Sequence, residues 1–240
     1  MKFVNRMNNH FDQIEDYDAE IPEHMRNYFV VRKTNFILEE IKKKFGRKLV
    51  KILDVGCGTG WHCKILSEKG YRVFGIDLSE NQVTQAKRNN PLSHFMIGDI
   101  LSLPYNDDAF DVSYTINTLH HLASRREQRK ALRELTRVTK KDGLIIVHEM
   151  NTKNPIIQFY LNHIFPKLRS IDEGREHWIP SDLWNELGEL DLQKIEYYTF
   201  MPDFTPRPLL PIFQSVEAFL ERTPIRSWSA HYMAVLKNSK

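Results

Sequence analysis

The 240-residue sequence holds only two cysteines, Cys57 and Cys63, whose positions show neither metal-site spacing nor a disulfide framework. No apolar run approaches the ~20 residues that a membrane-spanning helix needs, and the chain does not open with a signal peptide. Its formal net charge of +3 is too small to indicate nucleic acid, which would require basic residues clustered on one face. These absences favour a cytoplasmic protein with neither a transmembrane segment nor a nucleic-acid partner.

The composition that remains is that of an ordinary globular chain. Hydrophobic residues make up 41% of the sequence and charged residues 27%, and both values are typical of soluble proteins. A chain of this length can bury a sizeable core. We therefore expect a single domain that spans residues 1–240.

The most informative segment is 51–60, KILDVGCGTG, in which a short apolar run with an aspartate breaks into alternating glycines. A helical pattern follows, so the segment predicts a strand that enters a tight loop at a helix N-terminus. Glycines in such a loop can adopt positive φ and let the backbone approach a ligand, which then faces free N–H groups of the helix. The pattern is G-x-G-x-G without a following lysine, so it lacks the features of the common phosphate-binding loops.

Acidic residues close the next two strand patterns. Asp77 follows the glycine loop at about the distance typical of an acid that accepts hydrogen bonds from a ribose diol. Asp99 closes the third strand pattern, where it can accept a hydrogen bond from an adenine amino group. The ordered set of a glycine loop and two acids at successive strand ends predicts a bound nucleoside.

This set of motifs resembles the class I S-adenosylmethionine-dependent methyltransferases, most closely the small-molecule subgroup called type 11. The resemblance covers roughly residues 49–150 and is poor in the flanks. It rests on the segments 52–60, 75–79, 98–100, 103–112, 117–122 and 135–147.

The resemblance implies S-adenosylmethionine as the cofactor. In the family, the glycine loop lies beside the methionine part of the cofactor, the acid after the second strand holds the ribose, and a Gly-Asp-Ile segment brackets the adenine. The implied cofactor-binding residues are Asp54, Gly56, Cys57, Gly58, Gly60, Asp77, Leu78, Asp99, Ile100 and Asn117. Tyr28 and Arg32, on a helix expected at 23–45, are further candidates that could reach the cofactor's carboxylate. A core tyrosine and a surface arginine are the equally open alternative.

Methyl transfer from a sulfonium needs mainly alignment and exclusion of water, and the cofactor carries the difficult chemistry. A base is required only for a poorly acidic hydroxyl or a protonated amine. The candidates for this catalytic role are His120 and His121, because imidazole titrates near neutrality. The alternative is that the pair packs its loop against the following helix. Asp107 and Asp108 lie in a turn, and we expect no metal site.

Strand and helix patterns alternate through 48–150, which predicts a parallel sheet with helices on both faces and a ligand beyond the carboxyl ends of the strands. The family adds an antiparallel last strand. The expected fold is thus a Rossmann-like α/β fold, with a doubly wound, seven-stranded, mostly parallel sheet and helical cap insertions. The expected helices are 23–45, 60–69, 79–89 and 125–138, and the expected strands are 49–55, 71–76, 94–97, 110–115 and 143–149.

The segments around this core are expected to cover the site. Residues 1–47 would form an N-terminal helical cover over a cofactor-binding core at 48–150, and 151–180 and 201–227 would form substrate-cap insertions. Beyond residue 150 the patterns predict an amphipathic stretch at 155–168, a helix beginning at 180 with Ser181 as its N-cap, a strand at 192–200, a helix at 212–221 and a last strand at 229–236.

Segment 208–222 presents an apolar face at helical spacing. It could contact a membrane or a lipid-linked acceptor. Core packing or a contact in a homodimer is favoured, because the polar face carries more acid than base. The first functional hypothesis is a methyltransferase for a small-molecule acceptor, with O-methylation ahead of N- or C-methylation and a glycan or lipid-linked intermediate among the acceptors considered.

Two other hypotheses stay open. An NAD(P)-dependent oxidoreductase would require a third glycine at position 61, which is tryptophan. A non-catalytic partner protein could keep the nucleoside site and lack an acceptor pocket, because fold alone does not give function.

Overall fold

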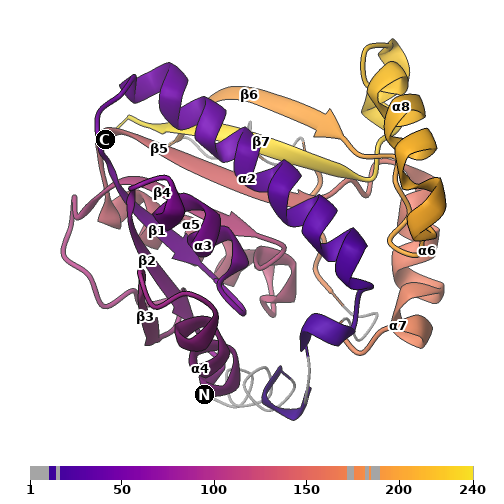
Figure 1. Cartoon of the computed structure of the whole chain (residues 1–240). Coiled ribbons are helices and arrows are strands. Elements are labelled where there is room, and N and C mark those ends of the chain that lie inside the picture. The colour runs from indigo at the N-terminus through magenta and orange to yellow at the C-terminus, as the bar shows by residue number, and fades with distance from the viewer. Residues whose placement is uncertain (1–10, 15–16, 172–175, 182–183, 185–189, 240) are drawn as a thin grey trace.

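The computed structural model describes residues 11–14, 17–171, 176–181, 184 and 190–239, and these residues form a seven-stranded sheet (Figure 1). The strand order is β3-β2-β1-β4-β5-β7-β6. Neighbouring strands from β3 to β5 pair in parallel, and β7 runs antiparallel to both β5 and β6. The strands are β1 (Lys51–Val55), β2 (Arg72–Asp77), β3 (His94–Ile97), β4 (Phe110–Ile116), β5 (Thr139–Met150), β6 (Leu190–Tyr198) and β7 (His231–Asn238). The predicted fold class is confirmed.

Helices cover both faces of the sheet, because the central strands are apolar on both sides. Residues of β1, β4 and β5 alternate between two apolar clusters, as the two-residue period of a strand requires. One cluster includes side chains of α2, α3 and α4, and the other includes those of α5. The helices are α2 (Glu23–Phe45), α3 (Trp61–Glu68), α4 (Glu80–Asn89), α5 (Arg125–Val138), α6 (Pro155–His163), α7 (Phe165–Leu168) and α8 (Leu210–Leu220), with short 3-10 turns η1 (Tyr17–Ala19), η2 (Leu119–His121), η4 (Arg207–Leu209) and η5 (Pro224–Trp228).

Helix boundaries in the core follow local signals closely. The Ser79 hydroxyl accepts a hydrogen bond from the backbone N–H of Gln82 and begins α4, and Ser124 does the same for α5 through Glu127. The helix predicted at 23–45 from its apolar stripe has the same bounds as α2. Local signals, a serine cap for α4 and α5 and an apolar stripe for α2, are sufficient to place these elements.

The last two strands lie two residues from their predicted positions. β6 ends at Tyr198 because Thr199 has a φ of 71°, and the Thr199 N–H donates to Glu221, which is distant in sequence. β7 begins at His231, and the Ser229 hydroxyl just before it donates a hydrogen bond to the His231 carbonyl. The body of the helix predicted from residue 180 lies outside the described residues.

The segments after residue 150 lie at one side of the molecule. Figure 1 shows α6, α7 and α8 together beyond the ends of β5, β6 and β7. Hydrogen bonds join these segments, since Asn154 donates to the Trp228 carbonyl and the Tyr160 hydroxyl to Asp203. Among the described residues, no helix is both long enough and apolar enough to cross a membrane. The division of the chain into a cover, a core and caps stays a prediction.

Candidate active site

The glycine loop leaves β1 and is tied to β2. The N–H groups of Gly56 and Cys57 both donate to the Ile76 carbonyl, at 2.8 and 3.1 Å. Gly56 has a φ of 75°, and a Cβ there would lie 2.2 Å from Thr118 Oγ1. A side chain at this position would therefore suffer both backbone strain and a collision, which explains the glycine.

Asp77 closes this loop from the end of β2. One carboxylate oxygen accepts the N–H of Gly58 at 2.8 Å and the other accepts the N–H of Ser79 at 3.0 Å. Burial raises the pKa of Asp77, while the backbone N–H groups oppose that shift. A carboxylate oxygen has more than one lone pair, so Asp77 can accept further hydrogen bonds from ligand hydroxyl groups.

A cavity of about 110 Å³ lies over the loop and the strand ends. Its wall contains seven of the predicted cofactor-binding residues, namely Gly56, Gly58, Asp77, Leu78, Asp99, Ile100 and Asn117. Phe11 and Tyr17, from the N-terminal cover, form another part of the wall. This volume is below the ~300–1,000 Å³ of most small-molecule sites.

Two residues in the wall of this cavity carry buried polar atoms. Among the described residues, Asn117 Oδ1 and both amide atoms of Gln82 have no hydrogen-bond partner. Asn117 also has a φ of 51°, which a non-glycine residue rarely adopts. Because buried polar groups are nearly always hydrogen-bonded, these atoms are suited to a polar ligand.

A second, larger cavity of about 430 Å³ adjoins the first. Tyr17, Asn117 and His121 line both cavities. The rest of its wall is mainly apolar and comes from α2, α6 and the segments 200–204 and 228–231. The arrangement places an apolar chamber next to the nucleoside cavity, with Asn117 and His121 at the junction.

Lys33 is a buried cation in the wall of this apolar cavity. Its ammonium lies over the Phe29 ring, and among the described residues it makes no hydrogen bond or ion pair. Burial lowers the pKa of Lys33 to about 8, although the charge of Glu149 acts in the opposite direction. An unpaired buried ammonium favours an anionic ligand group beside it.

His120 also lines the apolar cavity and is held by Glu149. The His120 Nδ1 lies 2.5 Å from a Glu149 carboxylate oxygen, and Glu149 also accepts the N–H of Leu119. The imidazole stacks on Trp178, with ring centroids 4.7 Å apart. With Nδ1–H donating to Glu149, Nε2 is the basic nitrogen of the ring.

Three residues predicted to bind the cofactor do not line the nucleoside cavity. Asp54 is buried beneath the loop, where it accepts hydrogen bonds from Tyr114 and Cys63, and burial raises its pKa to about 7. Cys57 is also buried in the core. Gly60 begins α3 with a φ of 81°, and a Cβ there would lie 3.0 Å from Ala86 and Phe95. These residues shape the loop from below.

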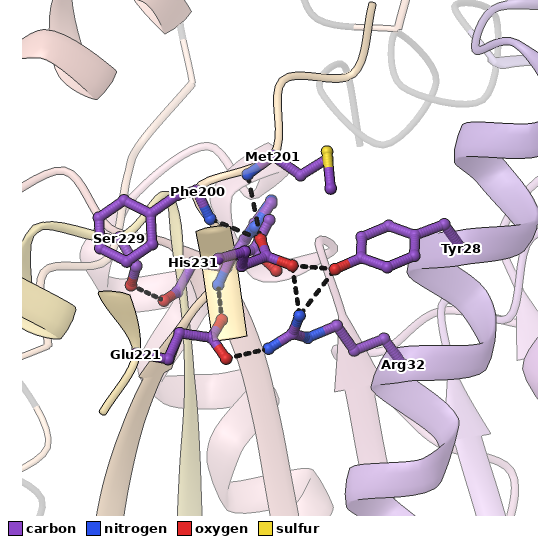
Figure 2. Close-up of polar contacts among 9 residues, drawn as sticks. Tyr28, Arg32, Phe200, Met201, Glu221, Ser229 and His231 are labelled. Atoms are coloured by element: carbon purple, nitrogen blue, oxygen red, sulfur yellow. Dashed lines mark hydrogen bonds and ion pairs between the residues drawn. The ribbon is translucent and has the colours of Figure 1, made fainter. Parts of the chain in front are cut away.

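The structure also corrects the expectation for Tyr28 and Arg32. Figure 2 shows both side chains extending from α2 toward α8. The Tyr28 hydroxyl and the Arg32 guanidinium bind Glu217, and Arg32 also binds Glu221. Neither residue lines either of the two cavities described above, because Glu217 and Glu221 bind both side chains.

Lys33 and Gln82 are site residues that the sequence patterns did not identify. Lys33 interrupts the i, i+4 series Phe29, Lys33, Ile37, Ile41 on the apolar face of α2. A lysine within an apolar stripe was the available signal. Gln82 does not stand out in the sequence in this way, because α4 is polar over most of its length.

The described residues contain no group of three or more His, Cys, Asp or Glu side chains arranged to hold a metal. Asp107 instead accepts a hydrogen bond from Arg137 at 2.9 Å.

Comparison with known proteins identifies the core of this structure. Residues 53–147 match the family model "Methyltransferase domain". Residues 53–147 therefore resemble a methyltransferase domain. This segment contains the glycine loop, both acids, Asn117 and the histidine pair, and thus both sides of the junction between the cavities.

Two curated relatives each match about half of the chain. The chain is 34% identical over 122 residues to a malonyl-[acyl-carrier protein] O-methyltransferase of Buchnera aphidicola, covering 50% of this chain and 47% of that protein. It is 31% identical to a demethylmenaquinone methyltransferase of Paenarthrobacter aurescens, covering 52% and 47%. The chain spans about half the length of these relatives.

A solved structure agrees with the fold over a longer stretch. It is a SAM-dependent methyltransferase from Thermotoga maritima, titled a possible histamine N-methyltransferase, and it matches with a TM-score of 0.63 at 16% identity, covering 90% of this chain and 95% of that chain. At this identity the likeness shows the fold alone.

Proposed function

We propose that this protein is an S-adenosylmethionine-dependent methyltransferase whose acceptor is a small amphipathic molecule with an acidic group. The observation that carries the proposal is the pair of adjoining cavities. One is lined by Asp77, Asn117 and Gln82, and the other is mainly apolar and contains the Lys33 ammonium, which pairs with no acid among the described residues. Asn117 and His121 stand where the two meet.

The residues of the first cavity are suited to the cofactor. Asp77 would hold the ribose diol, and Asp99 with Ile100 would flank the adenine. Gly56 and Gly58 present backbone without side chains, and Asn117 Oδ1 and Gln82 offer buried polar atoms that lack partners. When bound, S-adenosylmethionine supplies an electrophilic methyl group on a sulfur that leaves uncharged.

The protein contributes mainly orientation and exclusion of water. The apolar wall of the second cavity keeps water from the acceptor. His120, oriented by Glu149, is the proposed base, and its Nε2 would take the proton of an acceptor hydroxyl. O-methylation remains the favoured reaction, in agreement with the name of the relative that acts on malonyl-[acyl-carrier protein].

Lys33 is proposed to bind the acidic group of the acceptor. The carboxylate of the cofactor is the competing ligand, because the two cavities share a wall. Replacing Lys33 by methionine keeps its length and removes the charge. We expect the variant to raise the acceptor's KM and leave the affinity for S-adenosylhomocysteine unchanged; a loss of S-adenosylhomocysteine affinity would assign Lys33 to the cofactor.

The competing functions differ in their ligands. An NAD(P)-dependent oxidoreductase lacks support in the loop, because Trp61 stands at the third glycine position and its indole N–H donates to Asp18 at 2.9 Å. A non-catalytic partner would lack an acceptor pocket, whereas the described residues line a cavity of about 430 Å³ that would suit an acceptor. A homodimer and a cytoplasmic location remain predictions.

Calorimetry with S-adenosylmethionine, S-adenosylhomocysteine and NADH tests the cofactor. We expect both sulfur compounds to bind and NADH not to bind, and the reverse pattern would refute the proposal. A screen of amphipathic carboxylic acids and phenols with labelled methyl donor then tests the reaction. Binding of the cofactor without transfer to any acid or phenol would favour the non-catalytic alternative.

A further inference from the structure

The two cap segments expose an unusual share of the molecule's apolar side chains. Seventeen large apolar side chains are exposed among the described residues, and twelve of them lie in residues 156–168 and 204–228. Ile156 and Phe159 on α6 and Ile212 and Phe219 on α8 are each more than half exposed. We name the exposed side of α6, α7, η4, α8 and η5 the cap surface.

For the apolar face of α8, core packing or a dimer contact was favoured over a membrane contact, and the structure shows that this face does not pack in the core. The acids Glu217 and Glu221, four residues apart, both bind Arg32 of α2. Figure 2 shows the contact between Glu221 and Arg32. Glu217 also accepts the backbone N–H groups of Phe200 and Met201, at 2.7 and 3.1 Å. The inward side of α8 is therefore its acidic side, and the apolar side is left in solvent.

The charges that remain on the cap surface have one sign. In residues 151–171 and 202–229, all of which are described, the three acids are Asp203, Glu217 and Glu221, and each is bound to an arginine within the protein. The exposed cations on or directly beside α7, η4, α8 and η5 are Lys167, Arg207, Arg222 and Arg226, and Lys153, before α6, is a fifth exposed cation. An apolar surface surrounded by lysine and arginine is typical of elements that lie in the interface of an anionic membrane.

The apolar cavity opens toward this same surface. Ile156, Phe204 and Trp228 are each more than half exposed and also line the cavity of about 430 Å³. A molecule held in a bilayer would reach the cavity without crossing water.

From these observations we propose that the cap surface docks the protein on the surface of an anionic lipid bilayer. The apolar side chains of α6 and α8 would enter the interfacial layer, and the four cations would contact lipid phosphates. A symmetric dimer through this surface is less favourable, because it would bring the cations of one copy toward the same cations of the other. The proposal does not depend on the methyl-transfer reaction.

Co-sedimentation of the full chain with phosphatidylcholine vesicles, with and without phosphatidylglycerol, tests the docking. We expect binding to the anionic vesicles, weaker binding to pure phosphatidylcholine, and a decrease with added salt, which screens the charges. Arg222→Gln with Arg226→Gln should weaken anionic binding about thirtyfold, at about fivefold for each cation. Ile212→Glu with Phe219→Glu should abolish it.

Matched controls replace exposed apolar residues away from the caps. Leu49 and Leu92 are 70% and 69% exposed, so Leu49→Glu and Leu92→Glu add the same charge at the same exposure without touching the cap surface. These variants should bind vesicles as the wild type does. Since every altered side chain is exposed, unchanged circular dichroism and melting will confirm that the variants fold.

Three results would overturn the proposal. The first is equal binding to anionic and neutral vesicles or none to either, and the second is equal weakening by the cap and control variants. The third is a stable dimer in light scattering that Phe219→Glu separates, which would assign the cap surface to a second copy. Calorimetry with S-adenosylhomocysteine on the cap variants distinguishes loss of docking from loss of the cofactor site.

Discussion

Replacing Gly56 by alanine tests whether the glycine loop is shaped by the contacts described above. Gly56 has a φ of 75°, and the new Cβ would lie 2.2 Å from Thr118 Oγ1, 2.5 Å from Thr118 Cγ2 and 2.9 Å from Thr118 Cβ. Because the last of these atoms cannot rotate away, the backbone at Thr118 must shift. Thr118 lies in the wall of the nucleoside cavity, so the shift should reach the ligand.

Gly70 provides a matched control. Its φ is 87°, and a Cβ there would have no neighbour within 4 Å. Gly70→Ala should therefore cost only the strain of a left-handed backbone, about 1–2 kcal/mol. Gly56→Ala should add the cost of overpacking, about 1–3 kcal/mol, for a total of about 2–5 kcal/mol.

Urea unfolding of both variants measures these costs, and calorimetry with S-adenosylhomocysteine measures binding. We expect Gly56→Ala to be the less stable variant and to lose binding, with Gly70→Ala binding as the wild type does. Adding Thr118→Ala to Gly56→Ala should recover part of the stability, because it removes the two shortest contacts. Equal stability of the two glycine variants, with no recovery from Thr118→Ala, would refute the reasoning.

Three further predictions concern buried charges. Asp54→Asn should flatten the pH dependence of stability. Burial raises the pKa of Asp54 to about 7, so the folded wild type keeps a proton that the unfolded chain releases. The free energy of unfolding of the wild type should therefore fall by up to about 4 kcal/mol as pH rises from about 4 to about 7. Urea midpoints at about pH 5 and about pH 8 measure this, and an equal fall in the variant would contradict it. Arg32→Met should cost about 3 kcal/mol and lower Tm by roughly 6–12 °C, because Glu217 stays buried without its cation; an unchanged Tm in a thermal melt would be incompatible with that ion pair. Finally, the acceptor KM of the wild type should rise as pH increases through about 8, where the Lys33 ammonium loses its proton. Lys33→Met should show a high acceptor KM at every pH. A wild-type acceptor KM that does not change across that pH range would count against a charged Lys33.

The sheet and its helices could be predicted because their signals are local. The apolar period of 23–45, the serine caps at Ser79 and Ser124, and the glycine loop each lie within a few residues of the element they specify. The signals for the first cavity are also local, because Asp77 and Asp99 lie at or just after the ends of strands. The family resemblance supplies the order of those strands in the sheet. Asp77 therefore lies in the cavity wall where the pattern placed it.

The other half of the site depends on contacts between distant segments. Arg32 binds acids that lie 185 and 189 positions later in the chain, and a sequence pattern contains no sign of that pairing. The same pairing turns the acidic side of α8 inward and reverses the expected orientation of its apolar face. Lys33 likewise becomes unusual only once β5 and β7 bury it.

The central claim is that Asp77 and the glycine loop hold the nucleoside of S-adenosylmethionine, and calorimetry with S-adenosylhomocysteine on wild type and Asp77→Asn tests it most directly. Asp107→Asn is the control, because Asp107 is exposed, binds Arg137 and does not line the cavity. We predict that the wild type binds and that Asp77→Asn binds at least about tenfold more weakly, since a hydrogen bond to a charged group contributes ~1.5–3 kcal/mol. The control should change little. A wild type that does not bind S-adenosylhomocysteine, or an Asp77→Asn variant that binds it equally well, would contradict the account.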